Sequence, residues 1–187
     1  DAKLNKVKID VKSSFTNKPG TEIIGRKKIK DVNIIRGVSF TKNDAKVTLI
    51  GIKDKPGIAA AIFKPLSLNS INVDMVVQNI SANGKETDLT FTIKSEDLNK
   101  TKKIIKKNKD IRYRKLFFEK GVSKVSIIGV GMITTPGVTF RMFQALANKK
   151  INIQVISTSE IKISVLINKK NINKAVSVLH KEFKLDK

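Results

Sequence analysis

A segment of the sequence is repeated, and this repeat constrains the fold more than any other feature. Residues 46–81 read KVTLIGIKDKPGIAAAIFKPLSLNSINVDMVVQNIS, and the stretch from Lys124 onward reads KVSIIGVGMITTPGVTFRMFQALANKKINIQVISTSE. With two extra residues allowed before the second Pro-Gly, the identical positions are Lys46/Lys124, Val47/Val125, Ile50/Ile128, Gly51/Gly129, Pro56/Pro136, Gly57/Gly137, Phe63/Phe143, Leu66/Leu146, Ile71/Ile151 and Asn72/Asn152. Since internal repeats indicate duplicated structural units, we expect two similar domains.

The first copy predicts one βαββαβ unit. A β-branched run opens it as a buried strand, and apolar residues at helical spacing follow the Pro-Gly pair, where proline is tolerated in the first helical turn. We expect strands at 47–52, 72–80, 87–94 and 111–118, with a turn at residues 82–84. Helices should follow Gly57 and Ser95, with Ser95 as the cap of the second. Pro65 inside the first helix predicts a kink or an early end.

The second copy repeats this order, but the sequence ends before its last strand. We expect strands at 125–130, 151–157 and 161–167, and a last helix whose apolar stripe is Ile172, Ala175, Val176, Leu179 and Phe183. Folded proteins usually cover an open sheet edge, and residues 32–40 (VNIIRGVSF) have strand composition without a partner. The predicted fold class is α+β, with two ferredoxin-like domains of antiparallel sheet and helices on one face. The predicted domains are 46–120 and a discontinuous 31–45 plus 121–187.

Residue composition excludes several function classes. Because the chain has no cysteine and His180 is its only histidine, it cannot form disulfides, Cys/His zinc sites or a Ser-His-Asp arrangement. No apolar stretch approaches the roughly 20 residues that span a bilayer, and the first residues lack a secretion signal, so we expect a cytoplasmic protein without membrane contact. The net charge of +22 fits nucleic-acid binding, but only five of the 38 basic residues are arginine. We therefore interpret the scattered lysines as a solvated surface and expect no nucleic-acid partner.

Several stretches together resemble one family over nearly the whole chain. VTLIGIKDKPGIAAAIF, INVDMVVQNIS with TDLTFTI, and PGVTFRMFQALANKKINIQVISTSEIKISVLI resemble the paired ACT domains at the C-terminus of aspartate kinases. KVKIDVKSSFTNKPGTEI resembles the junction that follows the catalytic domain, so residues 1–30 are interpreted as a remnant of that linker. The family's catalytic Lys-Phe-Gly-Gly opening and a Walker-type loop are missing from the sequence, so this chain alone is not expected to catalyse a reaction.

The resemblance implies a regulatory part, either a separate subunit or an excised fragment, of an enzyme that phosphorylates aspartate with ATP and Mg²⁺. It implies feedback inhibition in the biosynthesis of lysine, threonine and methionine, by threonine, lysine or both, bound between ACT domains of two associated chains. The implied partners are a second copy, a catalytic domain or subunit, and the amino-acid effector. No cofactor or metal is expected in this chain itself, and the choice of effector stays open.

Residues 54–59 are the candidate binding turn on physical grounds. A bound amino acid needs partners for both its ammonium and its carboxylate. N–H groups near Gly57, Ile58 and Ala59, at the start of a helix, suit the carboxylate, and Asp54 suits the ammonium or a threonine hydroxyl. Gln78 and the segment 72–74 would complete the pocket. Alternatively, Asp54 is only a turn residue, because aspartate often precedes such turns.

Comparison of the two copies favours the binding interpretation. The second copy keeps Pro-Gly but has Thr134 at the position of Asp54 and Gln154 at the position of Asp74, so we interpret both acids as surplus to folding. The resemblance carries over an effector site made of Asp54, Ala59, Asn72, Val73, Asp74 and Gln78. Across a dimer, it would meet Thr139, Phe140, Asn152, Ile153, Gln154, Glu160 and Ile161.

Other readings stay open. Thr87 and Thr90 resemble positions near the effector, although buried strand threonines are equally expected to be structural. The alternative functions are an ACT pair that regulates another enzyme and a basic ferredoxin-like RNA-binding protein. The sequence lacks the Lys/Arg-Gly-aromatic motif of RNA recognition, which disfavours the latter.

Overall fold

The structure, a computed structural model, describes residues 9–16, 18–23, 34–80, 84–133 and 135–185, and the chain divides into two compact units, 1–33 and 34–187. In the first unit, strand β1 (Ile9–Val11) pairs antiparallel with β2 (Thr21–Ile23). This hairpin does not test the interpretation of residues 1–30 as a linker remnant, which stays a prediction.

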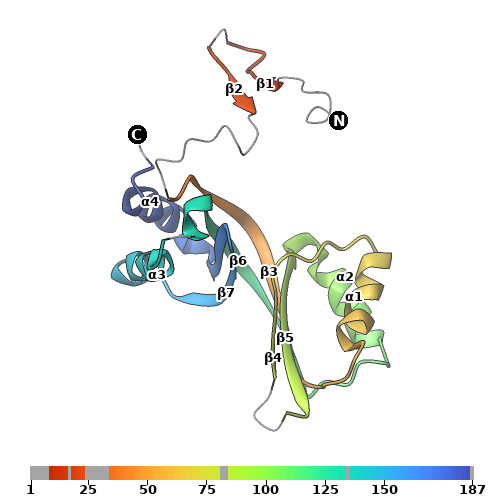
Figure 1. Ribbon diagram of the computed structural model, residues 1–187. Helices are drawn as coiled ribbons and strands as arrows, with labels where there is room; N and C mark the ends of the chain where they lie inside the picture. The colour runs from red at the N-terminus through yellow and green to blue at the C-terminus, as the bar shows by residue number, and fades with distance from the viewer. Residues whose placement is uncertain (1–8, 17, 24–33, 81–83, 134, 186–187) are drawn as a thin grey trace. The chain divides into compact units, whose positions relative to one another are not determined.

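The second unit contains both copies of the repeat (Figure 1). The first copy comprises β3 (Gly37–Lys53), α1 (Ile58–Leu68), β4 (Val76–Ile80), β5 (Glu86–Lys94), the 3₁₀ turn η2 (Ser95–Asp97) and α2 (Leu98–Lys107). The second comprises β6 (Lys115–Ile128), η3 (Val130–Ile133), α3 (Val138–Asn148), β7 (Ile153–Ser159), β8 (Lys162–Asn168), η4 (Lys169–Asn171) and α4 (Ile172–Glu182). In the described residues, no helix is long and apolar enough to cross a membrane.

A single antiparallel sheet, ordered β4-β5-β3-β6-β8-β7, joins the two copies through two long central strands. The first part of β3, residues 37–41, pairs with residues 124–128 of the second copy, and the rest pairs with residues 115–122. Asn43 and Gly121, with φ of 80° and 74°, lie where the register of this ladder shifts. Both residue types tolerate this left-handed conformation, so the strands continue past the irregularity.

This continuity corrects two strand predictions. The strands expected at 32–40 and 47–52 are one strand, β3, and those expected at 111–118 and 125–130 are one strand, β6. Alternation of apolar residues weakens at residues 41–46 and 119–124, which is why the sequence reads as two strands there, while the backbone ladder continues. Val32 and Asn33 lie outside the described residues.

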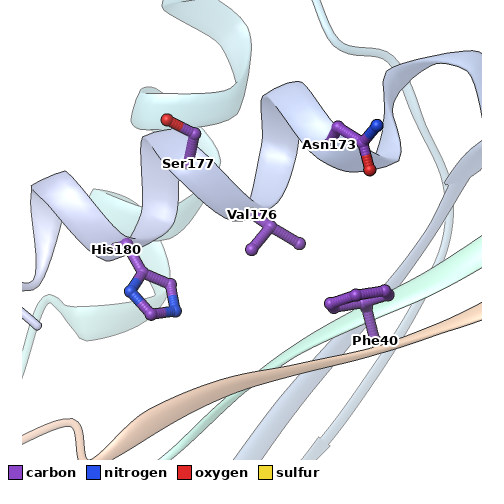
Figure 2. A pocket seen from close by; sticks show the side chains of 5 residues that line it. All are labelled: Phe40, Asn173, Val176, Ser177 and His180. Atoms are coloured by element: carbon purple, nitrogen blue, oxygen red, sulfur yellow. The ribbon is translucent and has the colours of Figure 1, made fainter.

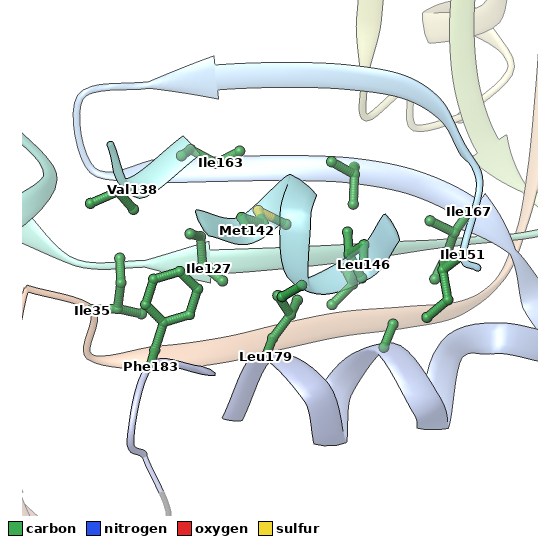
Figure 3. Close-up of a cluster of buried hydrophobic side chains, with 14 of the residues drawn as sticks. Ile35, Ile127, Val138, Met142, Leu146, Ile151, Ile163, Ile167, Leu179 and Phe183 are labelled. Atoms are coloured by element: carbon green, nitrogen blue, oxygen red, sulfur yellow. The ribbon is translucent and has the colours of Figure 1, made fainter. Parts of the chain in front are cut away.

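Each helix pair covers a core of its own. In Figure 1, α1 and α2 lie on one side of the strands and α3 and α4 on the other. Val47, Leu49 and Phe91 are fully buried in the first core, and Met142, Leu146 and Leu179 in the second (Figure 3). Ile35 and Val38, which precede the first copy, pack in the second core. The domain boundaries 31–45 plus 121–187 nevertheless stay a prediction.

A third, small cluster lies between the copies. It comprises Met75, Val122 and Leu166, with Val155 packed against it. On β8, Ile163, Val165 and Ile167 contact the second core, and because successive strand residues point to opposite faces, Leu166 points away from α3 and α4. Met75 of the first copy therefore packs against the sheet face of the second copy that is turned away from α3 and α4.

Three further expectations differ from the structure. Helix α1 continues through Pro65 to Leu68 and is as long as α3, so an early end at Pro65 is wrong, while the alternative, a kink, stays a prediction. Ser95 does not cap α2, because it is the first residue of η2. Neither η2 nor α2 has a side-chain hydrogen bond at its N-cap. The strand expected from residue 72 begins at Val76. Just before it, the Asp74 N–H donates to the Thr92 carbonyl, the Thr92 N–H donates to the Met75 carbonyl, and the Thr92 hydroxyl accepts the Met75 N–H, each at 3.0 Å.

The remaining strand and turn predictions differ only at their ends or cannot be compared. The strands expected at 87–94, 151–157 and 161–167 are β5, β7 and β8, displaced by one or two residues. Residues 82 and 83 of the expected turn lie outside the described residues.

Candidate functional site

A cavity of about 410 Å³ opens where β3 leads into α1. Its lining is Asp54, Lys55, Pro56, Gly57, Ile58, Ala59 and Gln78. The turn is fixed at its start by the Asp54 N–H, which donates to the Lys85 carbonyl at 3.0 Å. Gly57, with φ of 87°, adopts the left-handed conformation that directs the chain into the helix, and Gly137 does the same at 88° in the second copy. The fold therefore requires glycine in this turn in both copies.

This cavity presents both signs of charge. In the described part of the chain, the Asp54 carboxylate has no hydrogen-bond or ion-pair partner, and it is exposed. The N–H groups of Ile58 and Ala61 donate to Lys55 and Gly57, whereas those of Ala59 and Ala60 have no backbone acceptor among the described residues. Free N–H groups at a helix start favour an anion, and a carboxylate favours a cation. The charges of these groups are therefore complementary to those of a zwitterion.

Asp74 does not belong to this cavity. It lines a second one, of about 330 Å³, with Met75, Val76, Lys124, Ser157, Thr158, Ser159, Lys162 and Ser164. There its carboxylate forms an ion pair with the Lys124 ammonium, while 53% of the Asp74 side chain stays exposed. Asn72 and Val73 line neither cavity; Asn72 is exposed, and Val73 packs against the first core.

The ion pair of Asp74 has a counterpart in the other copy. Lys46, which the repeat equates with Lys124, reaches Gln154, which it equates with Asp74: the Lys46 Nζ lies 2.7 Å from Gln154 Oε1 and 2.7 Å from Glu119 Oε2. The Gln154 amide donates to Glu119 Oε1 at 2.9 Å. Each lysine thus contacts a position that sequence reasoning had placed in the effector site of the opposite copy.

This network lowers the pKa of Glu119. Partial burial acts to raise the pKa of this carboxyl group, but the hydrogen bonds from Lys46 and Gln154, together with the charge of Lys46, outweigh it and lower the pKa. The carboxylate is therefore held ionised at the seam between the two copies.

The second-copy candidates are spread over three places. Thr139 and Phe140 lie in the first turn of α3, and Glu160 and Ile161 lie between β7 and β8. Phe140 is 66% exposed and Ile161 43%, which is unusual for large apolar side chains. Asn152 precedes β7 and is exposed, whereas Ile153 begins β7 and packs against the second core. Thr134 lies outside the described residues.

Two threonines have structural partners. The Thr87 hydroxyl, almost fully buried, donates to the Asn79 carbonyl at 2.9 Å, and the Thr90 and Thr48 hydroxyls lie 3.1 Å apart. The described residues contain no cluster of acidic or histidine side chains that could hold a metal ion.

Sequence reasoning missed the roles of Lys46 and Lys124. The repeat has a lysine at both positions, but this identity only helps to align the two copies and does not indicate what the side chains contact. A lysine at the start of each buried strand is the signal that could have found them, because a cation in such a position requires an acceptor.

Comparisons with known proteins agree with this architecture. A model of the ACT domain matches residues 47–108 and 125–183. An aspartate kinase of Pseudomonas fluorescens (strain SBW25) is 43% identical over 182 residues, which are 96% of this chain and 44% of that protein. This chain therefore spans less than half the length of that relative.

Two crystal structures are similar over almost their whole length. The aspartokinase alpha and beta subunit structure has a TM-score of 0.72 and 39% identity, over 80% of this chain and 99% of the compared chain. The ligand-free regulatory subunit of aspartate kinase from Thermus thermophilus has a TM-score of 0.73 and 34% identity, over the same shares.

Proposed function

This chain belongs to the ACT-domain family, as the regulatory region of an aspartate kinase, and on this premise we propose that it binds threonine, lysine or both and thereby inhibits ATP-dependent phosphorylation of aspartate. The observation that supports binding most directly is the cavity at Asp54. It combines a carboxylate and helix-start N–H groups that have no partner among the described residues with the Gln78 amide. These are the groups that a desolvated amino acid requires.

The proposed complex includes a second copy of the chain. The Asp54 cavity is open on one side, and the second-copy candidates Phe140 and Ile161 present exposed apolar surface that a partner would cover. In a dimer, these residues of one chain would close the cavity of the other. The effector would then stabilise one arrangement of the dimer, and through it an inactive state of a catalytic domain or subunit. A coupling free energy of about 1–3 kcal/mol is typical for such control. The proposed setting is the cytoplasm.

The geometry supports Asp54 as a ligand contact more strongly than it supports Asp74. Asp54 is unpaired among the described residues, whereas Asp74 already contacts Lys124. We therefore place the ligand ammonium at Asp54. Asp74, Asn72 and Val73 stay predicted contributors without geometric support in the isolated chain.

Thermal unfolding with added amino acids tests the proposal. A ligand at one hundred times its dissociation constant adds about 2.7 kcal/mol of stability, which raises the melting temperature of a chain of this size by about 5–10 °C. We expect this shift with L-threonine, L-lysine or their mixture at millimolar concentration. Asp54→Ala should weaken the binding by about tenfold or more, because a charged hydrogen bond to the ammonium is lost.

The matched control is Glu96→Ala, which removes an exposed carboxylate just past Lys94, whereas the turn follows Lys53, which pairs with Glu86 at the opposite end of β5. This variant should bind as the wild type does. If no amino acid shifts the melting temperature of the wild type, the proposed function is wrong; if Asp54→Ala binds normally, only the placement of the ligand is wrong.

A further inference from the structure

Four lysines line one cavity at the joint between the two copies. Lys42 comes from β3, Lys120 from β6, and Lys169 and Lys170 from η4. The cavity has a volume of about 610 Å³, and no acidic residue lines it in the described part of the chain. By contrast, Asp54 and Asp74 line the two cavities described above.

The two acids nearest in sequence, Glu119 and Asp44, do not neutralise these lysines. The Glu119 carboxylate pairs with Lys46 at 2.7 Å. Asp44 is 4% exposed, and its carboxylate accepts a hydrogen bond from Thr41 and pairs with Lys94 at 3.5 Å. The negative charge of Asp44 is therefore already balanced by Lys94, which does not line the cavity.

Among the described residues, the contacts of these lysine ammonium groups are with neutral side chains. The Lys169 ammonium donates to the Asn43 side-chain oxygen, and the Lys42 Nζ lies 5.3 Å from the centre of the Phe40 ring. Within the described chain, Lys120 and Lys170 have no side-chain partner. Like charges in a concave surface reinforce each other's potential, so the cavity strongly attracts anions.

An adjoining groove offers apolar surface. Phe40 of β3 faces Asn173 and Val176 of α4, with Ser177 and His180 further along the helix (Figure 2). Phe40 is 44% exposed, and Asn173 lines both the groove and the lysine cavity. One molecule could therefore occupy both with a charged and an apolar part.

We propose that the lysine cavity binds a small molecule that carries two or more phosphate groups. Lysine ammonium groups act as point charges for phosphate, and the cavity volume is in the range of small-molecule sites. Two kinds of ligand would supply these phosphate groups: an inorganic polyphosphate, or a nucleotide whose organic part lies against Phe40. The site lies at the register shifts of β3 and β6, so its occupant would bridge the strands that join the two copies.

Calorimetric titration of the full 187-residue chain tests this proposal, with inorganic tripolyphosphate and ATP as probes, at 50 mM salt and without Mg²⁺. We expect saturable binding of tripolyphosphate that weakens by about tenfold or more in the double variant Lys120→Ala/Lys170→Ala, since each lysine contact to phosphate contributes about fivefold. Phe40→Ala should weaken ATP binding, and leave tripolyphosphate unchanged, if the ligand is a nucleotide. If Phe40→Ala changes neither probe, the site takes inorganic polyphosphate.

The matched control is Lys106→Ala/Lys107→Ala, which removes the same charge from the exposed end of α2. It should change tripolyphosphate affinity by less than about twofold. Equal losses in both double variants would show attraction to the overall charge and overturn the proposal, as would the absence of binding to the wild type. Melting curves of each variant verify that the fold is retained.

Discussion

The shared strands β3 and β6 predict that the two copies unfold as one unit. Neither copy has a complete sheet without residues of the other, since residues 37–41 of β3 pair only with the second copy, and residues 115–120 of β6 pair with the first. Loss of one core would therefore remove strand partners from the other core. A change in the second core should destabilise the first by the same free energy.

Leu146→Ala provides the perturbation. Leu146 is fully buried in the second core, and truncation of a buried leucine costs about 3 kcal/mol from lost burial and the cavity left behind. With a urea dependence of about 2 kcal/mol per molar, the unfolding midpoint should fall by about 1.5 M. The equivalent position in the first core, Leu66, is also fully buried and gives the reciprocal variant.

The chain supplies a local probe for this experiment. It has no tryptophan and a single tyrosine, Tyr113, which packs against the first core. Tyrosine fluorescence thus reports on the first copy, whereas far-ultraviolet circular dichroism reports on both. In Leu146→Ala, we expect both signals to shift together. A tyrosine midpoint that stays at its wild-type value, with a two-step dichroism curve, would refute the reasoning.

Two predictions concern the seam between the copies. Because contacts with Lys46 lower the pKa of Glu119 in the folded chain, its contribution to stability is present above its ordinary pKa of 4.5 and is lost as the pH falls through the lowered value. Glu119→Gln should therefore lower the free energy of unfolding at pH 7 by up to about 1 kcal/mol, and the difference from wild type should shrink below pH 4.5; a difference that is constant from pH 7 to pH 3 would contradict this. For the pair Asp74 and Lys124, a cycle of Asp74→Asn, Lys124→Met and the double variant, measured by urea unfolding, should give a coupling of about 0.5–1 kcal/mol. Zero coupling would show that the pair does not join the copies.

Much of the fold could be predicted because the repeat made each local signal appear twice. The helical spacing of apolar residues and the Pro-Gly turns predicted helices directly after Gly57 and Gly137. The structure has α1 and α3 at these positions. Of the two outcomes expected at Pro65, an early end does not occur, because packing overrides local propensity: Ile62 and Leu66 are fully buried, and this burial stabilises the helix although Pro65 lacks one backbone hydrogen bond. The sequence could not show that β3 and β6 run through both copies. Whether a strand continues depends on backbone pairing with its neighbour, which the pattern of side chains does not reveal.

For the site, comparison of the copies identified an asymmetry but not its cause. Asp74 and Gln154 occupy equivalent positions, and the acid was attributed to ligand binding because the fold of the second copy lacks it. The ladder provides another reason. Lys46 lies opposite Glu119 on the neighbouring strand, whereas Lys124 lies opposite Thr41.

Charge balance at these two lysines therefore accounts for the difference. Lys46 has a carboxylate across the ladder, so a neutral glutamine suffices as its second partner. Lys124, 9% exposed, has no acid across the ladder and obtains its carboxylate from Asp74. A nearly buried ammonium without an anion would be costly, so Asp74 is required where it stands without reference to any ligand. Asp54 has no comparable partner among the described residues, so of the two acids only Asp54 supports ligand binding.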